Sequence, residues 1–228
     1  MIDAWSPNFN ARPCTVDALV LHYTGMLTAE AAIARLRDPA AEVSSHYVVD
    51  EEGRVYRLVA EEMRAWHAGL SVWRGCCGLN DSAIGIEIVN PGHEWGYRAF
   101  PDAQIDAVTA LCLAIRRRHA IPARNVVGHS DIAPARKQDP GEFFPWQALA
   151  SAGVGLWPDV ADAGRGPGGM GEAAVRKALA TIGYGVQDVA LELLVRAFQR
   201  HWRPEGVTGD ADAGTIGRMT ALIAKIGG

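Results

Sequence analysis

Ten residues divide this chain into two unequal parts. The segment DAGRGPGGMG, residues 162–171, contains five glycines and one proline, and Met170 is its only large apolar side chain. Glycine-rich segments of this kind behave as flexible connectors, because they have few side chains to bury against a core. The sequence therefore predicts a large domain over residues 1–161, a glycine-rich linker over 162–171 and a small domain over 172–228.

Strand-like and helix-like patterns alternate along the large domain. Strand-like runs, apolar or alternating in polarity, occupy residues 16–25, 44–58, 82–90 and 125–129. Residues 44–58 contain two such runs joined by a polar turn at Gly53, which predicts a hairpin. Apolar residues recur at helical spacing over residues 27–38 and 101–120. The alternation predicts a mixed α/β domain.

The small domain has a purely helical pattern. Helix-like segments occupy residues 171–185, 189–202 and 213–226, which predicts a three-helix domain. The apolar faces of these helices contain Leu179, Leu194, Phe198 and Leu222. One role for such a domain is that of a helical cap, which stabilises the large domain through those faces.

Charge and cysteine content exclude some classes of partner and scaffold. Lys and Arg number 22 and Asp and Glu 26, so the formal net charge is -4 and no basic stripe is present. We therefore expect no nucleic-acid partner. Cys14, Cys76, Cys77 and Cys112 form no CxxC pair, which predicts buried free thiols and no disulfide framework.

The amino terminus and the hydropathy pattern bear on the compartment. The opening residues, MIDAWSPNFNARPC, lack a basic start, an apolar run and a small-residue cleavage site. No apolar stretch approaches the roughly 20 residues that a membrane-spanning helix needs. We expect a cytoplasmic chain without a transmembrane segment. A periplasmic or outer-membrane location is the alternative, if a leader has been removed.

Residues 128–141, GHSDIAPARKQDPG, place a histidine, an arginine, a lysine and an aspartate in one loop interrupted by two prolines. A catalytic zinc site typically has three protein ligands from His, Asp or Glu and leaves a fourth position for water. His129 and Asp139 are two candidates, and His22 is the best third. His22, Glu87 and His129 all lie at or near the carboxyl-terminal halves of predicted strands. The alternatives are hydrogen-bonded histidines without metal and an aspartate that caps its own turn.

Six motifs, in order, carry a family resemblance: LHYTG, VSSHYVV, AWHAG, NDSAIGIEIVN, NVVGHSDIAPARKQDPG and FPW. From about residue 16 to about residue 158 the chain resembles the zinc-dependent N-acetylmuramoyl-L-alanine amidases of the amidase type 2 family, above all its AmiD-like members. The resemblance implies a mixed central β-sheet flanked by helices. It also implies hydrolysis of the amide bond between N-acetylmuramic acid, or its anhydro form, and L-alanine of the peptidoglycan stem peptide, in cell-wall turnover or recycling.

The resemblance carries over to five positions of this sequence. The family's zinc ligands match His22, His129 and Asp139, its catalytic glutamate matches Glu87 and its catalytic lysine matches Lys137. Two neutral imidazoles and one carboxylate leave zinc net positive, so that a bound water loses its proton near neutral pH. Glu87 is expected to carry that proton to the leaving nitrogen, and Lys137 to stabilise the negative charge that develops on oxygen.

Substrate contacts are expected from four further residues. Arg136 matches a position used for substrate contact in related recycling enzymes, and its planar guanidinium suits a stem-peptide carboxylate. Tyr23 and Trp66 suit stacking on sugar or peptide. Ala133, in the same loop as Arg136, is the fourth candidate.

Other histidines and aromatic residues have structural interpretations. His46 and His67 fall in family-like motifs without matching a ligand, so we expect them to support the site or the scaffold. We expect ordinary hydrogen-bonded side chains at the remaining histidines, His93, His119 and His201. Trp73 and Arg74, in a glycine-containing segment, are expected to be exposed at the rim of the substrate groove.

The small domain is similar, over about residues 170–226, to three-helix peptidoglycan-binding domains. This resemblance favours a wall-anchoring module over the helical cap, since a tethered binder raises the local concentration of substrate. Peptidoglycan or muropeptide fragments are the expected partners of a monomeric chain. Two rival functions stay open: a non-catalytic peptidoglycan-recognition protein, and a zinc peptidase that cuts between amino acids.

Overall fold

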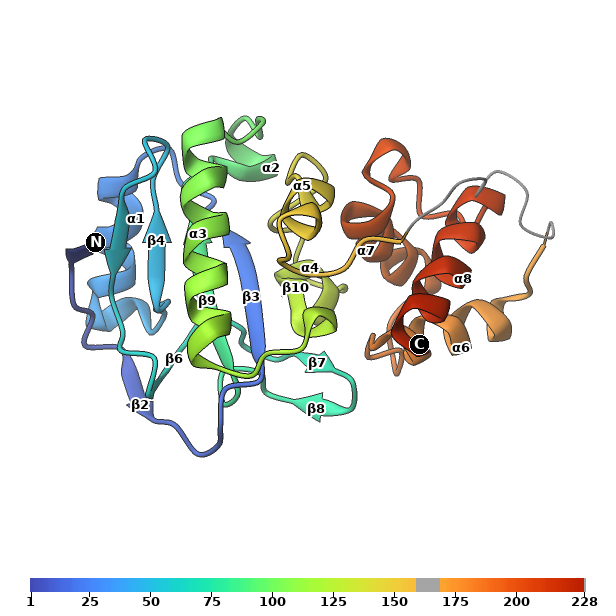
Figure 1. Ribbon diagram of the computed structural model, residues 1–228, viewed down its shortest axis with the longest axis horizontal. Coiled ribbons are helices and arrows are strands. Elements are labelled where there is room, and N and C mark those ends of the chain that lie inside the picture. The colour runs from blue at the N-terminus through green and yellow to red at the C-terminus, as the bar shows by residue number, and fades with distance from the viewer. Residues whose placement is uncertain (159–168, 228) are drawn as a thin grey trace.

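The computed structural model describes residues 1–158 and 169–227 (Figure 1). The expected linker, residues 162–171, lies outside the described residues except for its last three positions. The elements before it form a sheet with covering helices, and the elements after it form a group of helices at one end of the molecule.

A six-stranded mixed sheet forms the centre of the large domain. Its strands, in spatial order, are β1 (Ile2–Asp3), β5 (Val55–Arg57), β4 (Tyr47–Val49), β9 (Ala83–Ile88), β3 (Ala18–Tyr23) and β10 (Val126–Gly128). Strands β4, β9, β3 and β10 are mutually parallel, whereas β5 pairs antiparallel with β4 as the predicted hairpin, and β1 is parallel to β5. Two antiparallel ribbons lie outside this sheet: β2 (Phe9–Ala11) with β6 (Met63–Ala65), and β7 (Val72–Trp73) with β8 (Cys76–Cys77). The expected mixed α/β fold is confirmed.

The two faces of the sheet have different partners. Leu19 and Leu21 of β3 are buried in a cluster with helix α3 (Asp102–Arg118), which crosses the sheet in Figure 1. Because successive side chains of a strand point to opposite faces, Val20 and His22 point away from α3. Both sides of β3 are buried, as is usual for a central parallel strand. The face that carries His22 is the one on which the site forms.

Local signals explain where the two long helices of the large domain begin and end. Helix α1 (Ala29–Arg37) begins after Thr28, whose Oγ1 accepts a hydrogen bond of 3.2 Å from the N–H of Ala31. Helix α3 begins after Pro101, and three arginines in its last turn complement the helix dipole. The shorter helices are α2 (Gly92–Trp95), α4 (His129–Ile132) and α5 (Trp146–Ser151). Among the helices of residues 1–158 and 169–227, none is both long enough and apolar enough to cross a bilayer.

The small domain consists of the predicted helices α6 (Glu172–Ile182), α7 (Leu191–Trp202) and α8 (Ala213–Gly227). The four apolar residues singled out from the sequence are fully buried: Leu179, Leu194, Phe198 and Leu222. They belong to one apolar cluster together with Val20 and Val127 of the sheet. The helices therefore pack on the large domain in the way that the helical-cap alternative predicts.

Trp73 is not at the rim of a groove, and that expectation is wrong. Its side chain is 3% exposed, and its ring packs edge-on against Tyr184 of the small domain at 5.3 Å between ring centroids. The backbones of Trp73 and Tyr184 also form an isolated antiparallel bridge. The small domain covers this segment, so the burial of Trp73 could not be inferred from the composition of residues 71–81 alone.

The prediction of buried thiols holds for one cysteine and is wrong for three. Cys112 is fully buried on the apolar face of α3, as predicted. The exposed free thiols are Cys14, Cys76 and Cys77. Two of these, Cys76 and Cys77, form β8, in the β7–β8 ribbon outside the main sheet.

Candidate metal centre and active-site pocket

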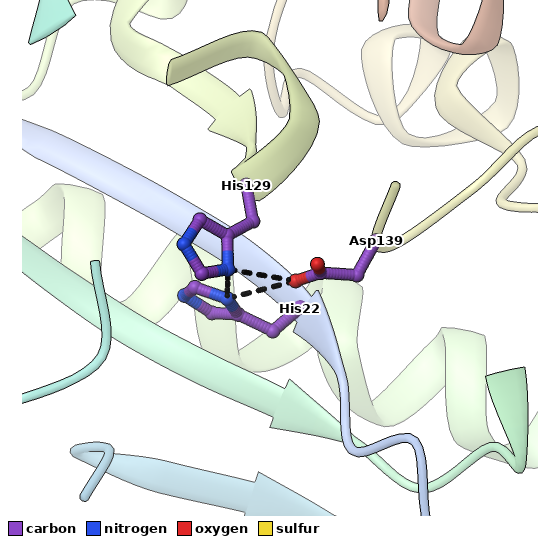
Figure 2. A group of neighbouring side chains, drawn as sticks. All are labelled: His22, His129 and Asp139. Carbon is purple, nitrogen blue, oxygen red and sulfur yellow. Dashed lines mark hydrogen bonds and ion pairs between the residues drawn. The ribbon is translucent and has the colours of Figure 1, made fainter. Parts of the chain in front are cut away.

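Three side chains from distant parts of the chain converge on one point (Figure 2). His22 lies near the end of β3, His129 begins α4 and Asp139 lies in the following loop. The Nδ1 atoms of the two histidines are 2.9 Å apart, and each lies 3.0 Å from Oδ2 of Asp139. All three residues are buried, and their ligand atoms lie within 4.8 Å of one another.

This geometry fits a tetrahedral cation site. Bonds of about 2.0–2.2 Å to a tetrahedral zinc ion place neighbouring donor atoms roughly 3.3 Å apart. The observed spacings of 2.9 and 3.0 Å require only a small outward movement of each side chain. A set of three donors of this kind would leave a fourth coordination position for water.

The sheet register brings the two histidines together. Strands β3 and β10 are parallel neighbours, and Leu21 is paired with Gly128, so the next residues, His22 and His129, leave adjacent strands side by side. The carbonyl oxygen of Asp139 then accepts a hydrogen bond of 2.9 Å from the N–H of Ser130. This bond folds the loop back on α4 and places the third side chain against the first two.

The AWHAG motif supports both histidines from behind. Nε2 of His22 lies 3.1 Å from Nδ1 of His67, and Nε2 of His129 lies 3.2 Å from the carbonyl oxygen of Ala68. The backbone N–H groups of His67 and Ala68 both donate to Oδ1 of Asn80. Such contacts fix which ring nitrogen faces the metal position. His67 therefore supports the site from behind, as expected for a histidine that matches no ligand position.

Gly85 makes room for this support. It lies on β9, and a Cβ atom at this position would be 2.4 Å from Cγ of His67. Any larger residue would push the His67 ring out of place, and with it the contact to His22. The glycine of the GIE motif is therefore required by close packing and not by a turn.

The surroundings of His22 and Asp139 set the protonation of these two candidate ligands. Desolvation and the neighbouring His129 lower the pKa of His22 to about 4, so its imidazole is neutral at neutral pH. Burial opposes ionisation of Asp139, but the two imidazoles outweigh it and lower the pKa of this carboxyl. A neutral imidazole and an ionised carboxylate are the forms that bind a metal ion.

Glu87 lies next to His22 on the neighbouring strand. The register pairs His22 of β3 with Glu87 of β9, so both side chains point to the same face of the sheet. Within the described part of the chain, Oε2 of Glu87 is buried and has no hydrogen-bond partner. Burial and the charge of Asp139 raise the pKa of Glu87, against the effect of Lys137. A carboxyl in this state is suited to accepting and returning a proton.

A cavity of about 380 Å³ opens over these groups. His129, Asp139, Glu87 and Lys137 line it together with two of the predicted substrate contacts, Tyr23 and Trp66. The phenol of Tyr23 lies 3.0 Å from Nδ1 of His93, and the indole N–H of Trp66 donates to Asn10. Both aromatic rings are thus held in place at the pocket wall.

Two predicted substrate residues have other structural partners. Arg136 lines the pocket, but its Nε and Nη2 donate to the carbonyl oxygen of Leu70, and Nη2 also donates to that of Ala68. The guanidinium thus holds the AWHAG loop, and its contact with a stem-peptide carboxylate stays a prediction. Ala133 is buried away from the pocket lining, and its carbonyl oxygen accepts from the N–H groups of Arg136 and Lys137. Ala133 is thus part of the turn that carries Lys137.

Sequence reasoning missed several residues of the pocket wall. They include Met26, Arg35, His93 and Trp95. His93 bridges the phenol of Tyr23 and the carboxylate of Glu142, the latter at 3.2 Å. The position of one segment was a usable signal. The segment NPGHEW, residues 90–95, comes just after the strand that carries Glu87. That end of the strand lies at the edge of the sheet where the other site residues are found.

A family model described as N-acetylmuramoyl-L-alanine amidase matches residues 11–142. The chain belongs to this amidase type 2 family. It is 40% identical over 234 residues to the N-acetylmuramoyl-L-alanine amidase AmiD of Escherichia coli, across 93% of this chain and 84% of that protein. It is 39% identical over 116 residues to the 1,6-anhydro-N-acetylmuramyl-L-alanine amidase AmpD of Citrobacter freundii, across 51% of this chain and 57% of that protein.

Solved structures resemble both domains of this amidase. The complex of E. coli AmiD with anhydro-N-acetylmuramic acid-L-Ala-D-gamma-Glu-L-Lys has a TM-score of 0.86 at 39% identity, and covers 96% of this chain and 93% of that one. AmpDh3 from Pseudomonas aeruginosa has a TM-score of 0.87 at 36% identity, with 93% of each chain covered. The likeness therefore includes the small domain and its position on the large one.

Proposed function

We propose that this amidase is a zinc-dependent hydrolase of the amide bond between N-acetylmuramic acid, or its anhydro form, and L-alanine of the peptidoglycan stem peptide. The observation that carries the proposal is the convergence of His22, His129 and Asp139 beside Glu87 at one pocket. The named activities of the relatives and the muramyl-peptide complex of AmiD support the same substrate class.

Zinc suits the donor set, because two imidazoles and one carboxylate are typical of its catalytic sites. When bound, it supplies Lewis acidity, which polarises the substrate carbonyl and lets a water molecule ionise near neutral pH. Glu87 takes the proton of the attacking water and returns it to the alanine nitrogen, because an amine anion is a poor leaving group. Its raised pKa and unpartnered Oε2 support both halves of this role.

Lys137 is assigned to the oxygen that becomes negative during the attack. It lines the same cavity, and its charge acts on Glu87 and His22. Removing a comparable electrostatic donor in other hydrolases typically lowers kcat by about 10²–10³-fold. Trp66 and Tyr23 are assigned to contacts with the sugar or peptide, because both lie in the pocket wall.

Two substitutions separate metal binding from proton transfer. Glu87→Ala should retain stoichiometric zinc, measured by metal analysis, and lose nearly all turnover. His129→Ala should lose both zinc and turnover, because it removes one of the three ligands. Near-normal turnover by Glu87→Ala would show that proton transfer does not depend on this residue.

Product analysis distinguishes the amidase from its rivals. Mass spectrometry of digests of intact sacculi and of anhydro-muropeptides, with and without a chelator, should detect free stem peptides that begin with L-alanine. A product that retains L-alanine on the sugar would identify a peptidase. Binding of muropeptide without release of peptide would identify a non-catalytic recognition protein.

The small domain is proposed to anchor the enzyme to the cell wall. Its similarity to peptidoglycan-binding helices supports this role, which adds to the packing role described above. Binding of the full-length His129→Ala variant to sacculi tests it, because that substitution disables the active site. The cytoplasmic location and the monomeric state stay predictions, which cell fractionation and sedimentation would check.

A further inference from the structure

Asp131 is a fully buried carboxylate two residues beyond His129. Its Oδ2 accepts hydrogen bonds from the backbone N–H of Gly128 at 2.7 Å and from Nδ1 of His201 at 2.6 Å. Its Oδ1 accepts a bond of 2.5 Å from the phenol of Tyr184. Two of these three donors belong to the small domain, so a single carboxylate joins the two domains immediately beside a candidate metal ligand.

Helix α4 depends on such partners for its orientation. It has only four residues, His129–Ile132, and a single helical turn has little stability of its own. Asp131 bonds back to Gly128, the residue that directly precedes His129, and so closes the start of the turn. Whatever holds Asp131 therefore also holds the backbone from which the His129 imidazole projects.

The two donors from the small domain are themselves fixed. The ring of His201 is stacked between Trp146 and Trp202, with ring centroids 3.7 and 3.6 Å apart. Tyr184 is buried and packs edge-on against Trp73. Neither donor can turn away from Asp131 without breaking an aromatic contact.

A second contact links helix α7 to the other end of the segment that carries the candidate ligands, residues 129–139. Arg200, the neighbour of His201 on α7, donates a hydrogen bond of 2.9 Å to Oε1 of Gln138. Gln138 lies between Lys137 and Asp139. Helix α7 lies beside α4 and therefore contacts both ends of the segment that carries His129 and Asp139.

We propose that Asp131, Tyr184 and His201 are positioning residues of the metal centre: the small domain, through Asp131, holds His129 in the orientation that binds the ion. The small domain then has a role in the catalytic site that is independent of any wall anchoring. This inference rests on the proposed metal function of His22, His129 and Asp139.

The chain contains a matched control for the test. Glu61 is a mostly buried carboxylate, which accepts 2.7 Å bonds from the phenol of Tyr47 and from Nε2 of His119. Like Asp131 it has a phenol and an imidazole as partners, although Arg118 also donates two bonds to it, and it lies outside the pocket and the loop. Tyr47→Phe and His119→Gln therefore measure how stability and zinc affinity change when a carboxylate distant from the site loses a hydrogen-bond donor.

The experiment measures zinc affinity of the full-length protein by competition with a chelator. Tyr184→Phe and His201→Gln should each weaken zinc binding by about tenfold, since loss of a contact that orients a metal ligand typically costs about 10–100-fold. Tyr47→Phe and His119→Gln should leave zinc affinity within twofold of the original protein. The kcat of Tyr184→Phe should fall while its KM stays nearly unchanged.

Unfolding of the metal-free variants in urea completes the comparison. If Tyr184→Phe and Tyr47→Phe lose similar stability but bind zinc equally tightly, the Asp131 cluster only holds the domains together, and the inference is overturned. If Tyr184→Phe does not fold, His201→Gln against His119→Gln decides the question by the same criterion. If the unsubstituted protein binds no zinc in this assay, the proposed metal site itself is wrong, which is a different result.

Discussion

His46 shows how a single buried residue couples this protein to pH. The N–H of Gly85 donates to Nδ1 of His46 at 3.0 Å, so the ring proton is on Nε2, which lies 3.1 Å from the carbonyl oxygen of Met63 and 2.9 Å from Nη2 of Arg12. A second proton, on Nδ1, would have no acceptor, because Nδ1 faces the N–H of Gly85. Burial and the nearby charge of Arg12 lower the pKa of His46 from 6.5 to about 3.

This shift predicts a loss of stability in acid. An unfolded histidine takes up a proton near pH 6.5, whereas folded His46 stays neutral until about pH 3. Between these values the unfolded state binds more protons, so the free energy of unfolding falls as the pH falls. The His46 contribution is about 2 kcal/mol between roughly pH 6.5 and pH 5, at about 1.4 kcal/mol per unit.

His46→Gln should remove that part of the pH dependence. Urea unfolding of the metal-free protein at about pH 7 and about pH 5 measures it for both chains, and the variant should lose about 2 kcal/mol less over this interval. An equal loss in the two proteins would show that folded His46 is protonated as readily as an unfolded histidine.

At the scale of elements, the apolar core under α3 and the chemistry lie on opposite faces of the sheet. Helix α3 packs on the face that carries Leu19 and Leu21, whereas His22 and Glu87 point to the other face. The long helix contributes apolar burial, and the one-turn α4 contributes a ligand. The two functions can therefore be changed separately.

Ile115→Ala tests this separation. Ile115 is fully buried between α3 and the sheet, and truncating such a side chain typically lowers the free energy of unfolding by about 2–5 kcal/mol. Zinc affinity and kcat/KM should stay near their original values at a temperature where the variant is folded. Ile105→Ala, at a half-buried position of the same helix, should cost less stability. A large loss of zinc affinity in Ile115→Ala would instead mean that α3 shapes the site.

At the scale of the whole molecule, one apolar cluster is shared by the two domains. Phe198 and Leu194 of α7 belong to the same cluster as Val20, Val127 and Ile132 of the large domain. The glycine-rich segment between the domains suggests independent units, but the buried surfaces do not. Because neither set of side chains is covered without the other, the domains should unfold together.

Calorimetry of the full-length protein should therefore show one thermal transition, with equal calorimetric and van't Hoff enthalpies. Phe198→Ala, which typically costs about 3–5 kcal/mol at a buried site, should lower the Tm of the whole protein and not of the small domain alone. Two separate peaks, of which the substitution moves only one, would contradict a shared core.

Local patterns in the sequence predicted the elements and the identities of the candidate ligands. The strands around His22 and Glu87, helices α1 and α3 and the three terminal helices occur where the apolar patterns of the sequence place them. Histidine, aspartate and glutamate in family-like motifs also indicated the chemistry, because side-chain chemistry is a property of the residue itself. Sheet order then brought His22 and His129 together, and the backbone bond between Ser130 and Asp139 added the third side chain.

Contacts between distant segments were decided only by the tertiary structure. Composition near Trp73 suggested an exposed group, and the family resemblance assigned Arg136 to the substrate, but Tyr184 covers Trp73 and the carbonyl oxygens of Ala68 and Leu70 accept hydrogen bonds from Arg136. His201 had no signal of its own, since its partner Asp131 lies 70 residues away. Local patterns report the conformation of a segment, whereas the burial and hydrogen bonding of a side chain depend on which other segments the fold packs against it.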